Sequence, residues 1–304
     1  MTWFFFALGA LLLWSGSDLF SKLGCQSETD RYSHLKMVMA VGLIMGLHAA
    51  FEVFVGGTVL NGQILLTYLP VSLLYILSMA IGYLGLRYIE LSISSPICNS
   101  SGAIVAALTA VTVGVKNTSR WQLAALILTC IGVFALGVVQ MTEDDELRRL
   151  RQEKSNRKYT KSAIALILPL VYCLLDALGT FADSIVLETL NEDSANAAYE
   201  LTFFFAGLVC AVYVLIVKKQ KLLPKAEAPK YLGAVFETAG QFCYIYALAD
   251  RSHVMYSAPI ISSYCAVSVL WSRIFLKEKL SWKHYAAIAV TMTGIVVLGL
   301  FEEL

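Results

Sequence analysis

Residues 141–161 read MTEDDELRRLRQEKSNRKYTK, a charged segment in a chain that otherwise consists mainly of apolar runs. A bilayer core of about 30 Å takes about 20 helical residues, and this segment separates five runs of that length from five more. The ten predicted transmembrane helices are 2–23, 34–55, 63–86, 95–115, 120–140, 162–185, 196–217, 231–249, 255–275 and 283–301. We therefore expect an all-α polytopic membrane protein with ten transmembrane helices.

The composition supports the same class of protein. Of the 304 residues, 58% are hydrophobic and 15% are charged, and the mean hydropathy is +0.69, whereas soluble domains are about a quarter charged. The net charge of +1 argues against a nucleic-acid partner, which requires a basic surface. The apolar runs lack the period-two alternation of a membrane β-barrel. The first run follows no basic segment, so we expect it to stay in the membrane.

The sequence contains no motif for cofactor chemistry. Its seven cysteines show no CxxC spacing, so we expect neither disulfides nor a metal site. Walker A, GxSxG and HExxH motifs are absent from the sequence, which argues against ATP-driven pumping and hydrolysis by this chain. We expect no cofactor, no catalytic residue and no enzyme.

The basic residues predict the orientation in the membrane. Of the 23 Lys and Arg residues, 20 fall on the face that carries 141–161 and 3 on the other. Cytoplasmic loops carry the excess of Lys and Arg. The distribution therefore predicts a protein of the plasma membrane with both termini outside the cell.

The two halves of the sequence resemble each other. SSPI at 94–97 corresponds to SAPI at 257–260, and LLWSGSDLFSK around Asp18 corresponds to LVYCLLDALGT around Asp176. Because five helices are an odd number, the second copy must cross the membrane in the opposite direction, and inverted repeats favour a binding site between the halves near the midplane. The predicted domains are a first repeat at 1–141, a linker at 142–161 and a second repeat at 162–304.

These features resemble the drug/metabolite transporter superfamily, in its ten-helix EamA-like group. The resemblance rests on the five-plus-five repeat, the Ser-x-Pro segments, and FLKEKLSWKHYAAIAVTMTGIVVLG at 275–299, with Glu278 at the family's acidic position. The first half has Val-Lys116-Asn117 there instead. The resemblance implies transport of small solutes. It also implies cytoplasmic termini, the opposite of what the charge distribution predicts here.

Acidic side chains inside the predicted helices are the strongest functional candidates, because a charge at the bilayer centre costs at least about 2.5–3.5 kcal/mol. Asp176 lies near the midplane, Asp18 is its repeat equivalent, and Glu237 lies two turns into its helix, with Tyr75 at the equivalent place in the first repeat. We predict that these residues bind substrate. Three further acids fall near helix ends, where they could simply reach water: Glu52, Asp183 and Glu200.

Aromatic residues gather near these acids. Trp14 precedes Asp18 by one turn, Tyr172 precedes Asp176 by one turn, and Tyr244 follows Glu237 by two turns. Carboxylates combined with aromatic faces bind organic cations, although aromatics at helical spacing also serve as packing residues. Gln241, one turn past Glu237, could orient a polar ligand.

His48 and Glu52 have i, i+4 spacing and share one helix face. Because a free His titrates near pH 6.5, the pair is a candidate for proton coupling, with a structural pair as the alternative. The glycines of Gly42-x-x-x-Gly46 could pack within one protomer or form a homodimer face. Pro96 and Pro259 fit plain helix starts, or bends at which Ser94, Ser95 and Ser257 line a cavity.

The sequence thus predicts a secondary transporter of a small cationic or zwitterionic amine, working by alternating access with proton coupling. Its expected partners are the small-molecule substrate and membrane lipid. A lipid flippase or accessory membrane subunit, and an intramembrane lipid-modifying enzyme, are the alternatives. A cavity open sideways to lipid would favour the flippase, and clustered catalytic groups at the membrane surface would favour the enzyme.

Overall fold

The computed structural model describes residues 2–26, 30–89, 91–112, 114, 119–141 and 163–300. The predicted linker at 142–161, together with Lys116 and Asn117, lies outside the described residues. Within these ranges the chain is helical and contains no strand. The predicted all-α membrane fold is confirmed.

The helices follow the ten predicted runs closely. In the first half they are α1 (Thr2–Cys25), α2 (Ser33–Phe51) with a π-helical end η1 (Glu52–Gly56), α3 (Gly62–Tyr88), α4 (Leu91–Cys98), α5 (Ser101–Thr112) and α6 (Arg120–Met141). In the second half they are α8 (Ala163–Val186), α9 (Glu192–Ala211) with η2 (Val212–Val217), α10 (Pro224–Leu248), η3 (Arg251–His253) leading into α11 (Val254–Ser262), α12 (Tyr264–Phe275) and α13 (Trp282–Leu300). Eight of these spans are long and apolar enough to cross a membrane.

Helix α10 begins seven residues before the predicted 231. Its first two turns, PKAEAPK, carry charges that made them read as a loop, but Pro224 fits the first turn of a helix. Glu227 and Lys230 are buried and form an ion pair of 2.8 Å. Because these charges are paired inside the protein, the helix continues through them.

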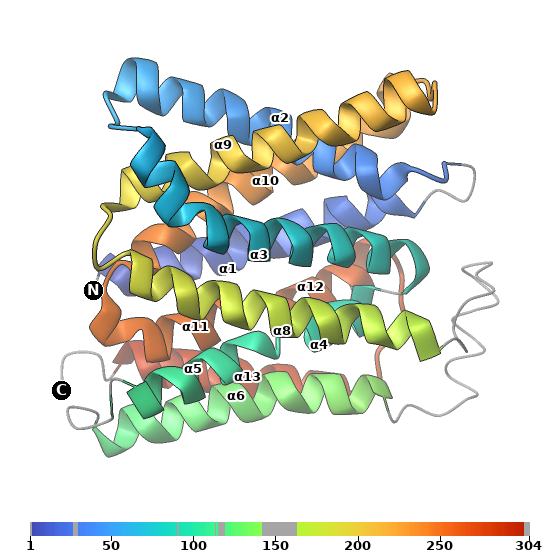
Figure 1. Cartoon of the computed structure of the whole chain (residues 1–304). Coiled ribbons are helices and arrows are strands. Elements are labelled where there is room, and N and C mark those ends of the chain that lie inside the picture. The colour runs from blue at the N-terminus through green and yellow to red at the C-terminus, as the bar shows by residue number, and fades with distance from the viewer. Residues whose placement is uncertain are drawn as a thin grey trace.

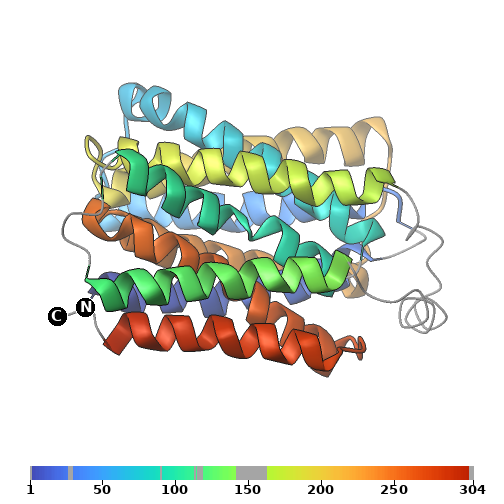
Figure 2. The same cartoon turned by 90° about the horizontal axis from the view of Figure 1, so that it is seen from below.

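The helices run side by side in one bundle. Helix α1 begins and α13 ends at the same end of it, and α6 ends and α8 begins at the other (Figure 1; Figure 2). We call these the terminal end and the basic end. The helix pairs in most extensive contact are α1 with α10, α2 with α9, α6 with α13 and α3 with α8. The set keeps its members when each helix is replaced by its predicted equivalent in the other repeat. The pair α1 with α10 then becomes α8 with α3, and the pairs α2 with α9 and α6 with α13 are unchanged.

Small residues set the close approach of these pairs. A Cβ at Gly132 of α6 would lie 2.2 Å from Thr291 Oγ1 of α13, and a Cβ at Gly294 of α13 would lie 2.3 Å from Thr129 Oγ1 of α6. Each glycine thus receives a threonine of the other helix. Gly42 packs in the same way on Gly207 of α9. The glycines at 42 and 46 therefore pack within the protomer.

The fourth and ninth spans are broken near their middles. Pro96 and Pro259 lie inside α4 and α11, and do not start a helix as the plainer expectation held. The first break falls at Asn99 and Ser100, and the second at Ser263. A proline removes one backbone donor and crowds the preceding turn. Both breaks lie after the prolines, three residues on in the first span and four in the second, so the missing proline donors do not account for them. Helix α11 is buried along its whole length.

The loop before α11 is tied to the start of the chain. His253 stacks on Trp3 with ring centroids 4.9 Å apart, and its Nδ1 lies 2.7 Å from a carboxylate oxygen of Asp250. Burial raises the pKa of Asp250, but hydrogen bonds from Ser252 and His253 outweigh it and hold that pKa below its usual range. The carboxylate is therefore kept charged as a cap for η3.

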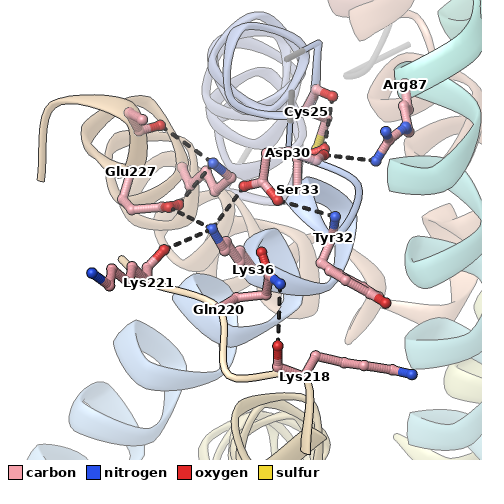
Figure 3. Close-up of polar contacts among 12 residues, drawn as sticks. Cys25, Asp30, Tyr32, Ser33, Lys36, Arg87, Lys218, Gln220, Lys221 and Glu227 are labelled. Atoms are coloured by element: carbon pink, nitrogen blue, oxygen red, sulfur yellow. Dashed lines mark hydrogen bonds and ion pairs between the residues drawn. The ribbon is translucent and has the colours of Figure 1, made fainter. Parts of the chain in front are cut away.

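A set of paired charges closes the basic end, as Figure 3 shows. Lys36 of α2 lies 2.8 Å from Asp30 and 3.1 Å from Glu227 of α10, and Glu227 also pairs with Lys230. Arg87 of α3 donates to the backbone carbonyl of Asp30 at 2.7 Å. Three helices and the loop between α1 and α2 are therefore joined at this end.

Candidate functional site

A cavity lies among the broken helices and α1, α3, α8, α9 and α10. The space open to the centre of a water molecule is about 70 Å³, enough for several waters. All eight residues that the sequence predicts for substrate binding line it: Trp14, Asp18, Tyr75, Tyr172, Asp176, Glu237, Gln241 and Tyr244. Ser94 and Ser95 also line the cavity, and Ser257 does not.

The three cavity carboxylates accept hydrogen bonds from serine hydroxyls. Asp18 accepts from Ser95 at 2.5 Å and from Ser268 at 2.8 Å. Asp176 accepts from Ser101 at 2.7 Å, and Glu237 accepts from Ser17 at 2.6 Å. Each carboxylate is thus oriented by neutral donors, which leave its charge uncompensated.

The break in the fourth span places two of these donors. Ser95 precedes the break, on α4, and Ser101 follows it, on α5. One hydroxyl reaches Asp18 of α1 and the other reaches Asp176 of α8. A straight helix would carry residues six apart on different faces, so the bend helps to direct both hydroxyls to the two repeat-equivalent aspartates.

No basic side chain compensates the acids within the described lining of the cavity, which contains no Lys, Arg or His. Removing an ion from water still costs several kcal/mol after the protein relaxes. Ionised carboxylates without a cationic partner therefore favour the entry of a cation, or the uptake of protons.

Aromatic rings form a wall beside the carboxylates. Trp14 lies tilted against Tyr244 with centroids 5.0 Å apart, and edge-on to Tyr264 at 5.9 Å. Close glycines hold these rings: a Cβ at Gly240 would lie 2.4 Å from the Trp14 ring, and one at Gly82 would lie 2.8 Å from the Tyr172 ring. The rings are therefore fixed between helices and can present faces to a cation.

Asp183 lies deeper than the sequence suggests. Its carboxylate is fully buried and accepts from Tyr68 at 2.8 Å and from Tyr75 at 3.5 Å. The Tyr75 hydroxyl is also hydrogen-bonded to that of Tyr244, so these groups bound the cavity on its terminal side. The expectation that Asp183 reaches water is wrong because tyrosines of α3 cover it.

His48 and Glu52 do not line the cavity. His48 Nδ1 lies 2.8 Å from a carboxylate oxygen of Glu200 on α9, and its Nε2 lies 3.8 Å from Glu52. Glu200 is fully buried and also accepts from Asn196 at 3.1 Å. The expectation that Glu200 reaches water is therefore wrong. Glu200 pairs instead with His48 of α2, 152 residues away in sequence.

Several lining residues were missed in the sequence. They include Ser17, Ser21, Tyr83, Tyr199 and Tyr264. Ser17 and Ser21 flank Asp18 on α1, and this local spacing was a usable signal. No such local signal marks Tyr83, Tyr199 or Tyr264, because the packing of neighbouring helices decides which face of a helix lines the cavity.

Comparison with known proteins places this arrangement in a family. Residues 163–300 match the EamA-like transporter family. The second half of the chain is thus similar to the EamA-like transporters. The resemblance to the drug/metabolite transporter superfamily is thereby confirmed, and the family comprises membrane transporters of small molecules, not enzymes. The apolar spans of both halves indicate a multi-pass membrane protein.

A solved structure described as "Crystal structure of protein" superimposes on this chain with a TM-score of 0.61. The superposition covers 97% of this chain and 96% of that chain at 12% sequence identity. Such a likeness shows a shared fold over both halves. No curated protein matches the chain.

Proposed function

We propose that this protein is a secondary transporter that moves small organic amines, cationic or zwitterionic, across the plasma membrane. The observation that carries the proposal is the set of three cavity carboxylates whose hydrogen-bond partners are hydroxyls. An ammonium group supplies the missing positive charge, and the rings of Trp14 and Tyr172 beside the acids add cation–π attraction.

Alternating access follows from the two halves. Residues 1–141 and 162–304 act as inverted repeats joined by the linker at 142–161, and the solute site lies between them. The exchange of equivalent helix pairs, such as α1 with α10 and α3 with α8, supports this division. The broken fourth and ninth spans both line the cavity, so a small rotation of one repeat changes the side from which it is reached.

In the proposed proton coupling, the cavity carboxylates lose their ammonium partner when the amine leaves. A cavity carboxylate without its ammonium takes up a proton in preference to remaining a buried, unpaired charge. The His48–Glu200–Glu52 group joins α2 to α9 outside the cavity and provides a second place for a proton. Inward proton flow would then drive the amine in the opposite direction.

Uptake into proteoliposomes tests the proposed transport. Purified protein is reconstituted, and accumulation of ethanolamine, phenethylamine, leucine and isocaproate is followed under an imposed pH gradient. We expect accumulation of ethanolamine and phenethylamine, with leucine as the zwitterionic comparison, and none of isocaproate. We also expect a loss of about tenfold or more in Asp176→Asn. Glu227→Gln, which removes a buried charge outside the cavity, should leave uptake in place. Equal uptake by wild type and Asp176→Asn, or transport of isocaproate alone, would overturn the proposal.

A further inference from the structure

Three polar atoms of the cavity lining have no hydrogen-bond partner. They are Ser21 Oγ, Tyr83 Oη and Gln241 Nε2, and their residues are only 1%, 5% and 3% exposed. A buried polar group without a partner is destabilising, and such groups in a native protein call for an explanation. A solute that brings its own hydrogen-bonding group supplies one.

These atoms flank one carboxylate. Ser21 lies one turn beyond Ser17 on α1, and Gln241 lies one turn beyond Glu237 on α10, while Ser17 and Glu237 are joined by their hydrogen bond. Because α1 and α10 are antiparallel, the two free groups lie to either side of that bond. Tyr83 lines the same cavity from α3. Glu237 therefore has neutral polar groups on both sides, in addition to the serines that bond to the two aspartates.

The charges of the lining restrict which chemical group of a solute can bond to these atoms. The amide nitrogen of Gln241 requires an acceptor, which could be a hydroxyl, a carbonyl or a carboxylate oxygen. Asp18, Asp176 and Glu237 would all repel a carboxylate, and the described lining offers no cationic side chain to it. The nearest lysine along α1, Lys22, points its Nζ to the backbone carbonyls of Leu86 and Ile89 at the end of α3. A neutral acceptor satisfies the free groups without that repulsion.

We propose that the substrate is an organic amine with a hydroxyl or amide group, and that amino acid zwitterions are excluded. This rests on the proposed transport of amines and narrows it. The ammonium lies with Asp18 and Asp176, and the neutral polar group lies with Gln241, on the side of Glu237 away from Ser21.

Matched ligand series test the proposal by isothermal titration calorimetry on the purified full chain. Each series keeps one amine skeleton and changes one group: ethanolamine, glycinamide and glycine; leucinol, leucinamide and leucine; phenylalaninol, phenylalaninamide and phenylalanine. In the series that fits the cavity, we expect the alcohol and the amide to bind about tenfold or more tightly than the acid. An acid that binds as tightly as its alcohol and amide overturns this inference and leaves amine transport standing. If no member of any series binds, both proposals fail.

Single substitutions locate the neutral group. Gln241→Met should weaken binding of the alcohol or amide about threefold to tenfold, the effect of one hydrogen bond, and should weaken binding of the parent alkylamine by less. Ser72→Ala is the matched control, because Ser72 is also buried and unpartnered but lies outside the lining. An equal loss of binding for the alcohol and the alkylamine, or equal effects in Gln241→Met and Ser72→Ala, would contradict the assignment.

Discussion

At the scale of single residues, the buried acids differ by their partners. Asp18, Asp176 and Glu237 are bonded to serines in the cavity, whereas Glu200 is bonded to a histidine outside it. A serine hydroxyl orients a carboxylate but adds no charge, while a histidine can hold a proton for it. The first group fits solute binding, and the His48–Glu200 pair fits proton transfer.

His48→Gln tests the second role. Glutamine keeps a donor for Glu200 but cannot carry the proton, so we expect gradient-driven amine accumulation in proteoliposomes to be lost while amine exchange stays within about twofold of wild type. His34→Gln provides the control, because His34 lies on the same helix at the basic end and has an unpaired Nδ1. Unchanged accumulation in His48→Gln would refute proton transfer through this pair.

At the scale of helices, close packing between equivalent elements holds the two halves together. The reciprocal contacts of Gly132 with Thr291 and of Gly294 with Thr129 bring α6 and α13 together at matching heights. Membrane helices associate through such small residues because lipid provides no hydrophobic drive between them.

Gly132→Ala should therefore destabilise the protein. The added Cβ would lie 2.6 Å from the backbone nitrogen of Thr291, which cannot rotate away, and overpacking costs about 1–3 kcal/mol. Thermal unfolding in detergent should occur at a lower temperature than in wild type. Gly62→Ala has open space around its Cβ and should change little. Equal unfolding temperatures for both variants would mean that α6 and α13 are not held in this way.

Helix positions were readable from hydropathy, but helix ends and breaks were not. The ten runs, and the repeat that aligns Asp18 with Asp176, follow from local sequence. The first turns of α10 read as polar because their charges are paired only in three dimensions, by Lys36 of another helix. The burial of Glu200 and Asp183 escaped prediction for the same reason: His48 and Tyr68 cover them from other helices.

At the scale of the molecule, the charge distribution and the cavity bear on direction of transport. The 20 Lys and Arg residues of one face include the paired Lys36, Arg87 and Lys230 at the basic end. The predicted orientation places that end in the cytoplasm, and Asp183 with its tyrosines on the outer side of the cavity.

Labelling of intact cells tests this orientation. Thr189→Cys lies on an exposed loop at the terminal end, and Lys225→Cys lies at the exposed start of α10 at the basic end. A membrane-impermeant maleimide should label the first on intact cells and the second only after permeabilisation. The reverse pattern would place both termini in the cytoplasm, as in the relatives that the sequence resembles.

The most direct test of the central claim, that the acidic cavity is the solute site, is ligand-induced thermal stabilisation of the purified protein. A ligand at 100 times its dissociation constant stabilises the folded state by about 2.7 kcal/mol. We predict that amines raise the unfolding temperature of wild type and of Glu227→Gln, and do not raise that of Asp176→Asn or Asp18→Asn. Stabilisation by anions alone, or the same stabilisation by amines in the aspartate variants, would contradict the account.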